Sequence, residues 1–321
     1  MENQIKIFYS KEWKDYELLD TGEGEKLERV GGYTFVRPAE SAVWSKTLPR
    51  EVWEKADGKF WSSKEGARAG ARLASASNAS RGGWKLHSKV SPKWEMQYKG
   101  IKFLASPTPF RHLGFFPEEA AHWDFIEEKI KGAKKPIKFL NLFGYTGVAS
   151  LFALRAGAEV THVDASKQVL NWAKENQKLN SHLGLDKLPM RVIEDDVMKF
   201  LAREEKRGNK YDAIIMDPPK YGRGPKGEVW KIEEMLPKLL MQVKKVLSDK
   251  PLFIILTSYA TDSSSLTLGY ALENVMTSFG GQVETGESAR VESGELCILE
   301  KSNNRFIPLA NTAVWEPVRI N

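Results

Sequence analysis

The chain has 321 residues, of which 41% are hydrophobic and 28% charged, the composition of an ordinary globular protein. No apolar run reaches the ~18–20 residues of a membrane span, and the first residues lack the apolar segment of a signal peptide. The single cysteine, Cys297, excludes an internal disulfide and a cysteine-based zinc cluster, and the five histidines show no metal-ligand spacing. We therefore expect a cytoplasmic protein without a membrane segment or a bound metal.

Most of the net charge of +6 lies in the first 110 residues, which hold 19 Lys/Arg against 14 Asp/Glu. Ten basic residues fall between Lys59 and Lys102, with only two acids, Glu65 and Glu95. The aromatic residues interleaved with them are Phe60, Trp61, Trp84, Trp94 and Tyr98. Basic segments with interleaved aromatic rings are typical of nucleic-acid binding. The alternative is a solvated basic loop beside core tryptophans.

Residues 1–117 are expected to form a small, β-rich, basic domain that contacts RNA. Residues 33–36 read as a strand that Arg37-Pro38 ends, because proline removes a backbone donor. Residues 62–83 are small and basic without an apolar period, which indicates a flexible loop. Residues 98–104 predict a hairpin with Lys99-Gly100 at its turn.

A second domain is expected over residues 118–321. A helix at 118–131 ends at Gly132, and strands then alternate with helices. Strands are expected at 137–143, 159–163, 190–194, 212–216 and 251–257, and helices at 147–156, 166–180, 196–207, 229–248 and 265–279. Late strands near 282–291 and 306–315 would form an antiparallel edge. This order predicts an α/β class: a Rossmann-like, doubly wound sheet with an antiparallel last strand, behind a smaller β-rich domain.

The first of these strands runs into a glycine turn, Asn141 to Gly147. Gly144 and Gly147 let the chain turn sharply and lie close to a ligand. Ligands of open α/β sheets bind at the carboxyl ends of the strands. A generic strand-to-helix turn is the alternative.

Acidic residues close the next two strands. Asp164 follows Gly147 by 17 residues, near the ~20 expected for an acid that binds ribose hydroxyls. Asp196 comes after the third strand, where a carboxylate can accept from an adenine amino group. Either residue could instead be a helix N-cap.

The sharpest motif is Asp217-Pro218-Pro219-Lys220-Tyr221. Two prolines directly after an apolar strand cannot continue a sheet and form a rigid, extended turn. The turn would fix the Asp217 carboxylate and a proline carbonyl at the reacting centre. We expect Tyr221 to stack on a flat substrate, with Lys220 and Arg223 on a basic rim. Trp230 is either a second stacking surface or a core residue.

These segments resemble the class I S-adenosylmethionine-dependent methyltransferases of bacterial large-subunit ribosomal RNA, a group of cytosine-C5 and guanine-N7 enzymes. The resemblance rests on residues 141–147, 164–167, 196–200 and 217–221, and on Arg111 to Phe116, which is similar to a segment before the catalytic domain. It covers about residues 98–321 and implies S-adenosylmethionine as cofactor and RNA as substrate. Residues 1–95 do not match the RNA-binding barrel of many members.

The strand ends and the resemblance together give the expected site. Asp217, Pro218, Pro219 and Tyr221 are the expected catalytic residues. The expected cofactor contacts are Asn141, Phe143, Gly144, Tyr145, Thr146, Gly147, Asp164, Ala165, Ser166, Asp196, Val197 and Asp217. The expected substrate contacts are Lys220, Arg223, Arg111, His112 and Phe115, although His112 could equally be a packed histidine.

Which atom accepts the methyl group can be judged from whether a thiol lies in the site. Cytosine-C5 enzymes need a thiolate that adds to the ring, and the corresponding position in this chain reads Thr257-Ser258-Tyr259. Cys297 reads as a small buried hydrophobe. We therefore favour a nitrogen acceptor. The alternatives are a protein or small-molecule methyltransferase on the same fold, and a non-catalytic, cofactor-binding RNA-associated protein.

Overall fold

The computed structural model describes residues 5–11, 13–61, 82–224, 226–259, 263–276 and 290–317. They form two compact units. The sheet unit comprises the described residues of Met1–Tyr9, Glu118–Cys297 and Pro308–Asn321, and the N-terminal unit those of Ser10–Pro117 and Ile298–Ile307. A single boundary at residue 117 is therefore too simple, because Lys6–Phe8 form strand β1 of the large sheet.

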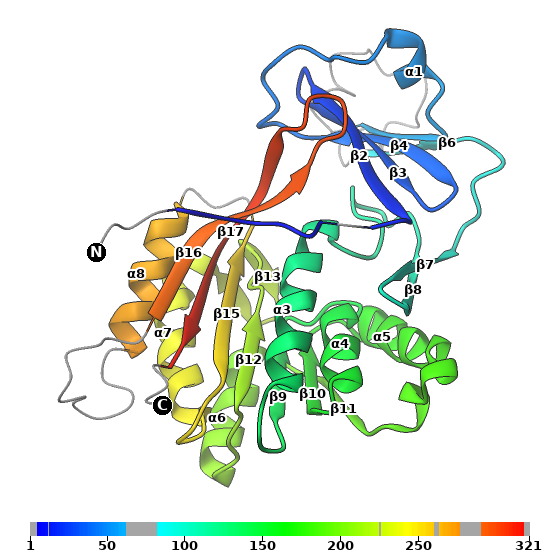
Figure 1. Ribbon diagram of the computed structural model, residues 1–321. Helices are drawn as coiled ribbons and strands as arrows, with labels where there is room; N and C mark the ends of the chain where they lie inside the picture. The colour runs from blue at the N-terminus through cyan, green and yellow to red at the C-terminus, as the bar shows by residue number, and fades with distance from the viewer. Residues whose placement is uncertain are drawn as a thin grey trace. The chain divides into compact units, whose positions relative to one another are not determined.

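The sheet unit is built on one eight-stranded sheet in the order β1-β16-β17-β15-β12-β9-β10-β11 (Figure 1). The strands are β9 (Lys138–Leu142), β10 (Glu159–Asp164), β11 (Met190–Glu194), β12 (Ala213–Met216), β15 (Phe253–Ser258), β16 (Arg290–Leu299) and β17 (Phe306–Glu316). Strands β11, β10, β9, β12 and β15 are parallel, whereas β17 runs antiparallel to β15. This arrangement confirms the predicted fold class.

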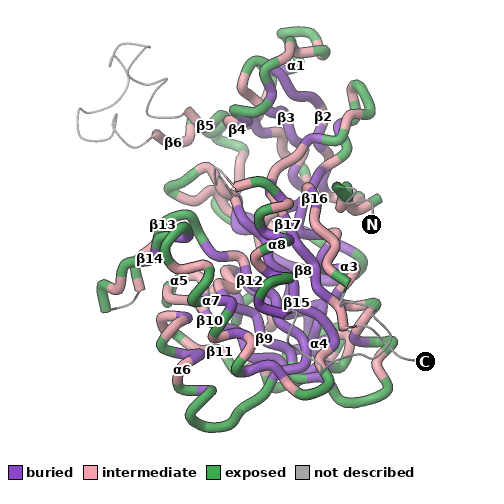
Figure 2. The backbone as a smooth tube through the Cα atoms, turned by 90° about the vertical axis from the view of Figure 1, so that its left-hand side faces the viewer, coloured by how far each residue is buried: buried purple, intermediate pink, exposed green. Residues whose placement is uncertain are grey.

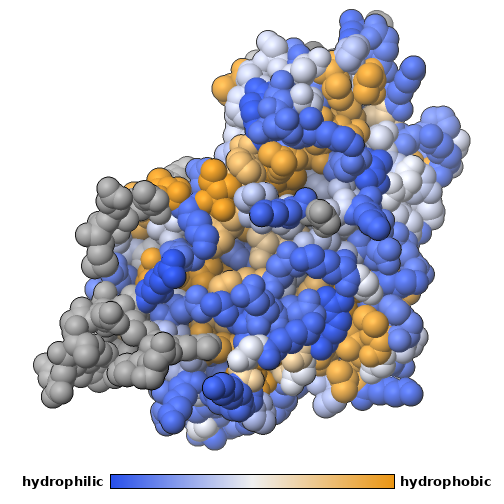
Figure 3. Space-filling view, in the orientation of Figure 1, coloured by the Kyte–Doolittle hydropathy of each residue, from blue (hydrophilic) through white to orange (hydrophobic). Residues whose placement is uncertain are grey.

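Helices cover both faces of the sheet (Figure 1). They are α3 (Ala120–Lys131), α4 (Val148–Arg155), α5 (Lys167–Leu179), α6 (Val197–Arg207), α7 (Ile232–Val246) and α8 (Ser265–Met276). Helices α3, α4 and α5 contact one another in one layer, and α6, α7 and α8 in the other. Because both faces are covered, the central strands are continuous apolar runs and are buried throughout (Figure 2). The outer side of the α3–α5 layer is mainly hydrophilic (Figure 3).

Two expected boundaries were wrong. The helix expected from residue 229 begins at Ile232, because Val229–Lys231 form strand β14, which pairs with β13 (Tyr221–Arg223). The strand expected at 282–291 runs instead from Arg290 to Leu299, and residues 282–289 lie outside the described ranges, as does the end of the expected helix 265–279. Most of the expected flexible loop, residues 62–81, also lies outside them, and β6 (Gly83–Leu86) begins within its last residues.

The N-terminal unit is β-rich, as predicted. A five-stranded sheet has the order β2-β3-β4-β5-β6. Its further elements are β2 (Tyr16–Gly22), β3 (Glu25–Val30), β4 (Tyr33–Pro38), α1 (Arg50–Glu54), β5 (Gly58–Trp61), and the hairpin of β7 (Trp94–Tyr98) with β8 (Ile101–Ala105). The hairpin turn is Lys99-Gly100, with φ of 46° and 83°, which confirms the predicted turn.

Two aromatic residues of the basic segment, Phe60 and Tyr98, belong to the core of this unit, and Trp84 and Trp94 are partly buried beside them. Phe60 and Tyr98 are 7% and 1% exposed, and the Trp94 ring is stacked on Phe35 with centroids 5.7 Å apart. The Trp84 indole N–H donates to the carbonyl oxygen of Thr108 at 2.9 Å. Phe60 and Tyr98 are therefore core residues, and base stacking by the partly exposed tryptophans stays a prediction.

Candidate functional site

The turn after β9 holds an unusual backbone. Phe143 and Tyr145 have φ of 57° and 52°, and Gly147, the N-cap of α4, has φ of 83°. Left-handed conformations are costly for residues with a Cβ and are concentrated at functional sites. Two such residues within three positions show that the surrounding structure enforces this shape.

A buried polar relay behind the turn provides that support. Asn141 Nδ2 donates to Ser150 Oγ at 3.0 Å, and Ser150 Oγ lies 3.0 Å from His162 Nδ1. His162 Nε2 lies 3.2 Å from the Tyr145 carbonyl oxygen. Burial lowers the pKa of His162 to about 4, so the ring is neutral and one tautomer satisfies both neighbours: the Ser150 hydroxyl donates to Nδ1, and Nε2–H donates to Tyr145. Asn141 is therefore part of this relay and supports the turn from behind.

His162 also explains a glycine. A Cβ on Gly144 would lie 2.3 Å from His162 Cε1, so this position has no room for any side chain. The sequence interpretation assigned this glycine to close approach of a ligand, whereas the structure assigns it to packing of the relay. Gly147 is required by its positive φ.

Asp164 ends β10 with both carboxylate oxygens turned to the backbone of neighbouring loops. Oδ2 accepts the Tyr145 N–H at 3.0 Å and Oδ1 accepts the Ser166 N–H at 2.9 Å. Burial raises the pKa of Asp164 above its usual range. Each carboxylate oxygen can accept a second hydrogen bond, so the residue joins the turn after β9 and retains capacity for a diol.

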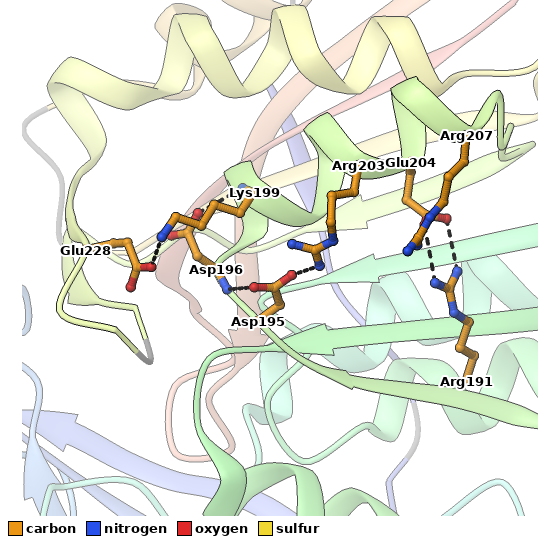
Figure 4. A network of polar contacts seen from close by, with 8 residues as sticks. All are labelled: Arg191, Asp195, Asp196, Lys199, Arg203, Glu204, Arg207 and Glu228. Atoms are coloured by element: carbon orange, nitrogen blue, oxygen red, sulfur yellow. Dashed lines mark hydrogen bonds and ion pairs between the residues drawn. The ribbon is translucent and has the colours of Figure 1, made fainter.

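Asp196 is the N-cap of α6, where its Oδ1 accepts the Lys199 N–H at 2.9 Å. The Lys199 ammonium also pairs with Glu228, in the turn between β13 and β14, and Arg203 pairs with Asp195 (Figure 4). The capping alternative is thus observed for Asp196, and the second carboxylate oxygen remains a candidate acceptor for an adenine amino group.

The diproline turn follows β12 at the next strand end. Register pairs Met216 of β12 with Leu142 of β9, so the turn and the Asn141–Gly147 loop are neighbours at the carboxyl edge of the sheet. Trp230 lies in the core, 6% exposed, and its indole N–H donates to the Pro219 carbonyl oxygen at 2.6 Å. Tyr221 is 53% exposed, and Lys220 and Arg223 are exposed beside it.

The comparisons with known proteins agree with this geometry. Residues 38–274 match the family model described as S-adenosylmethionine-dependent methyltransferase. The chain belongs to this family. The crystal structure of an S-adenosylmethionine-dependent methyltransferase from Agrobacterium tumefaciens is 40% identical, with a TM-score of 0.85, and the match covers 98% of this chain and 94% of that one.

Curated relatives of the methyltransferase match over shorter stretches. The ribosomal RNA large subunit methyltransferase K/L of Alteromonas mediterranea is 30% identical over 206 residues, 61% of this chain and 28% of the relative. The ribosomal RNA large subunit methyltransferase I of Aeromonas salmonicida is 35% identical over 127 residues, 39% of this chain and 30% of the relative. The chain thus spans less than a third of the length of these two curated relatives.

The site of the methyltransferase fits S-adenosylmethionine, the cofactor of its family. Asp164 offers acceptor capacity for ribose hydroxyls, and the strained turn presents backbone amides at the first turn of α4. Of the other expected cofactor contacts, Phe143 and Ala165 are partly exposed and Ser166 is exposed, whereas Thr146 and Val197 are 1% and 4% exposed. The Thr146 carbonyl accepts from Asn176 Nδ2 at 2.9 Å.

The sequence interpretation missed an acidic cluster beside Asp217. Glu118 and Glu119, at the start of α3, are 5% and 8% exposed, and the Tyr259 hydroxyl donates to Glu119 Oε1 at 3.3 Å. Burial and the Asp217 and Glu118 charges raise the pKa of Glu119 well above its usual value. Burial and Glu118 raise the pKa of Asp217 to about 8. The sequence signal was the pair of acids before the helix, directly after the Gly-Phe-Phe segment.

The other expected substrate residues belong to the N-terminal unit. Phe115 is 3% exposed and packs against Trp13 and Phe103, so its ring is a core side chain. Arg111 pairs with Glu40 at 3.1 Å. Burial, with Arg37 nearby, lowers the pKa of His112 to about 3, so this histidine is a neutral, largely packed ring.

Cys297 lies on β16 and is 2% exposed, and burial raises the pKa of its thiol to about 12. A thiol that stays protonated at neutral pH is a poor nucleophile. Within the ranges that the structure describes, no three His, Cys, Asp or Glu side chains form a group able to hold a metal ion. Nor does any helix in those ranges have the length and apolar character of a membrane span.

Proposed function

We propose that this protein transfers a methyl group from S-adenosylmethionine to a nitrogen of a base in RNA, most specifically in large-subunit ribosomal RNA. The observation that carries the proposal is the meeting, at one sheet edge, of the strained turn after β9, the Asp164 carboxylate and the Asp217 diproline turn. The ribosomal RNA enzymes among its relatives support the substrate class. A ribosomal substrate would place the activity in the cytoplasm.

When bound, S-adenosylmethionine supplies a methyl group whose carbon–sulfur bond breaks, leaving the electron pair on sulfur, as the acceptor lone pair forms the new bond to carbon. The residues of the chain position the two partners. Asp164 holds the ribose, and the turn at Phe143–Gly147 fixes the cofactor tail. Tyr221, exposed beside the diproline turn, stacks on the base. In-line transfer needs mainly this positioning.

Asp217 has a second role if the acceptor is an amino group, which loses a proton on methylation. With a pKa raised to about 8, the Asp217 carboxyl is mostly protonated at neutral pH, and its ionised form is the base that can take this proton. The neighbouring Glu118 and Glu119 place two more carboxyl groups beside Asp217, and burial together with the charges of Asp217 and Glu118 raises the pKa of Glu119 well above its usual value, so this cluster favours protonated carboxyl groups. The buried, protonated Cys297 thiol supports a nitrogen acceptor over a cytosine C5.

The test is transfer of a tritiated methyl group to fractionated ribosomal RNA and to ribosomal protein, followed by mass spectrometry of the nucleosides. We expect label in the RNA, in a nucleoside methylated on nitrogen. Asp217→Ala should lose the transfer while still binding S-adenosylhomocysteine, which shows that the variant is folded. Label in the protein fraction alone would favour a protein methyltransferase, and a C5-methylated cytosine would refute the nitrogen acceptor.

A further inference from the structure

The ribbon of β13 and β14, which follows the diproline turn, has two different faces. Register pairs Gly222 with Trp230, and Tyr221 and Arg223 with Lys231 and Val229. Those last four residues are all exposed, whereas Trp230 is 6% exposed. Directly opposed residues of an antiparallel pair share a face. Trp230 is thus the one large side chain on the inner face of this ribbon, within the described residues 221–223 and 229–231.

Trp230 contacts both halves of the proposed site. Its indole N–H donates to the Pro219 carbonyl oxygen at 2.6 Å. Its ring lies 5.1 Å from the Phe143 ring, at an interplanar angle of 60°. Phe143 belongs to the strained turn after β9, and Pro219 to the turn after β12. One side chain therefore bridges the cofactor turn and the diproline turn.

The ribbon also packs closely against the diproline turn at Pro219, the residue that Trp230 contacts. A Cβ on Gly222 would lie 3.3 Å from Pro219 Cγ, so the glycine allows a tight approach. The Ile232 N–H donates to the Lys220 carbonyl at 3.1 Å, which closes the base of the ribbon. At the other end, Glu228 pairs with Lys199 of α6 (Figure 4). The ribbon is anchored at both ends, and Trp230 ties it to the diproline turn and to the cofactor turn.

We propose that Trp230 is a positioning residue for methyl transfer, which holds the diproline turn at a fixed distance from the cofactor turn; this inference rests on the proposed function. Packing alone would be served by phenylalanine. The N–H donor adds a directional bond that holds the Pro219 carbonyl and so keeps it from the substrate. A turn with two prolines donates no amide of its own at these positions, so its orientation depends on bonds to its carbonyl oxygens. Trp230 supplies one.

Trp230→Phe separates the two contributions, because the ring still packs on Phe143 while the donor is lost. The matched control is Trp315→Phe, which removes an indole from the same core at the opposite end of β15, where Trp315 is paired with Ile254. Three quantities are measured on each protein: the dissociation constant of S-adenosylhomocysteine, kcat and KM for RNA methylation, and amide hydrogen exchange of the peptide covering residues 214–224.

We expect Trp230→Phe to lower kcat about 10- to 100-fold, the effect of a small misplacement at a reacting centre. Binding of S-adenosylhomocysteine should stay within about threefold, since the Phe143 contact is kept. Exchange in residues 214–224 should become faster. Trp315→Phe should lower Tm but leave kcat and this exchange unchanged.

The inference would be overturned if Trp230→Phe kept the wild-type kcat and exchange. It would also be overturned if cofactor binding, Tm and kcat fell together, because that pattern indicates a purely structural role. If the wild-type protein transfers no methyl group to RNA, the proposed function fails. In that case the exchange comparison still decides whether Trp230 holds the turn.

Discussion

Substitution of Asp164 by asparagine tests the cofactor site at its best-defined side chain. The carboxylate accepts the Tyr145 and Ser166 amides at 3.0 and 2.9 Å, one on each oxygen. Asparagine has a single acceptor oxygen, so its NH₂ group must face one of these donors. The same change removes the charged acceptor for the ribose hydroxyls.

The expected loss follows from these bonds. A hydrogen bond to a charged group contributes about 1.5–3 kcal/mol, which corresponds to roughly a 10- to 150-fold weaker dissociation constant for S-adenosylhomocysteine. Stability should change less. Burial raises the pKa of Asp164, so its ionised form is costly in the folded state, and removing the charge offsets part of the lost amide bond. We expect Tm to fall by roughly 2–4 °C, or about 1 kcal/mol.

The assay is isothermal titration calorimetry with S-adenosylhomocysteine, with thermal unfolding alongside. The control variant is Asp186→Asn, an exposed aspartate in the short turn Leu185–Lys187 of the same unit. It should bind like the wild type. Equal affinities for Asp164→Asn and the wild type would refute the role given to this carboxylate.

Three further outcomes are expected. Glu119→Gln should flatten the pH dependence of stability: the folded pKa is raised, so the wild type loses stability as pH rises above about 4.5, and parallel melting curves from pH 5 to 9 would contradict this. Ser150→Ala should cost about 1–3 kcal/mol in urea unfolding, because it leaves Asn141 and His162 without their shared partner, and an unchanged midpoint would argue against the relay. The logarithm of the RNA association constant should fall linearly with log[salt], since phosphate contacts release counterions. A flat salt dependence would contradict phosphate contact.

Much of the sheet unit could be predicted from its sequence because parallel strands place their ends together. The apolar runs before Leu142, Asp164 and Asp217 fixed three strands and therefore one edge. The roles of individual residues at that edge were harder to predict from the sequence. Gly144 makes room for His162, a residue 18 positions away, which no local pattern shows.

The residues that were missed need three-dimensional information. Glu119 comes to Asp217 and Tyr259 only when α3 packs beside the ends of β12 and β15. Trp230 was named as either a stacking surface or a core residue, and the structure shows the latter; it was placed in a helix because strand β14 is only three residues long. The rings of the basic segment left two interpretations open for a related reason: alternating aromatic and basic residues suit either a core strand or a base-stacking surface, and Trp94 packs on Phe35.

The central claim is that the carboxyl edge of β9, β10 and β12 binds S-adenosylmethionine. The most direct measurement is calorimetric titration of the full chain with S-adenosylhomocysteine, followed by competition with S-adenosylmethionine. We predict saturable binding of one molecule per chain, competed by S-adenosylmethionine and weakened by Asp164→Asn. Absence of binding by the folded wild-type protein, or binding that Asp164→Asn leaves unchanged, would contradict the account.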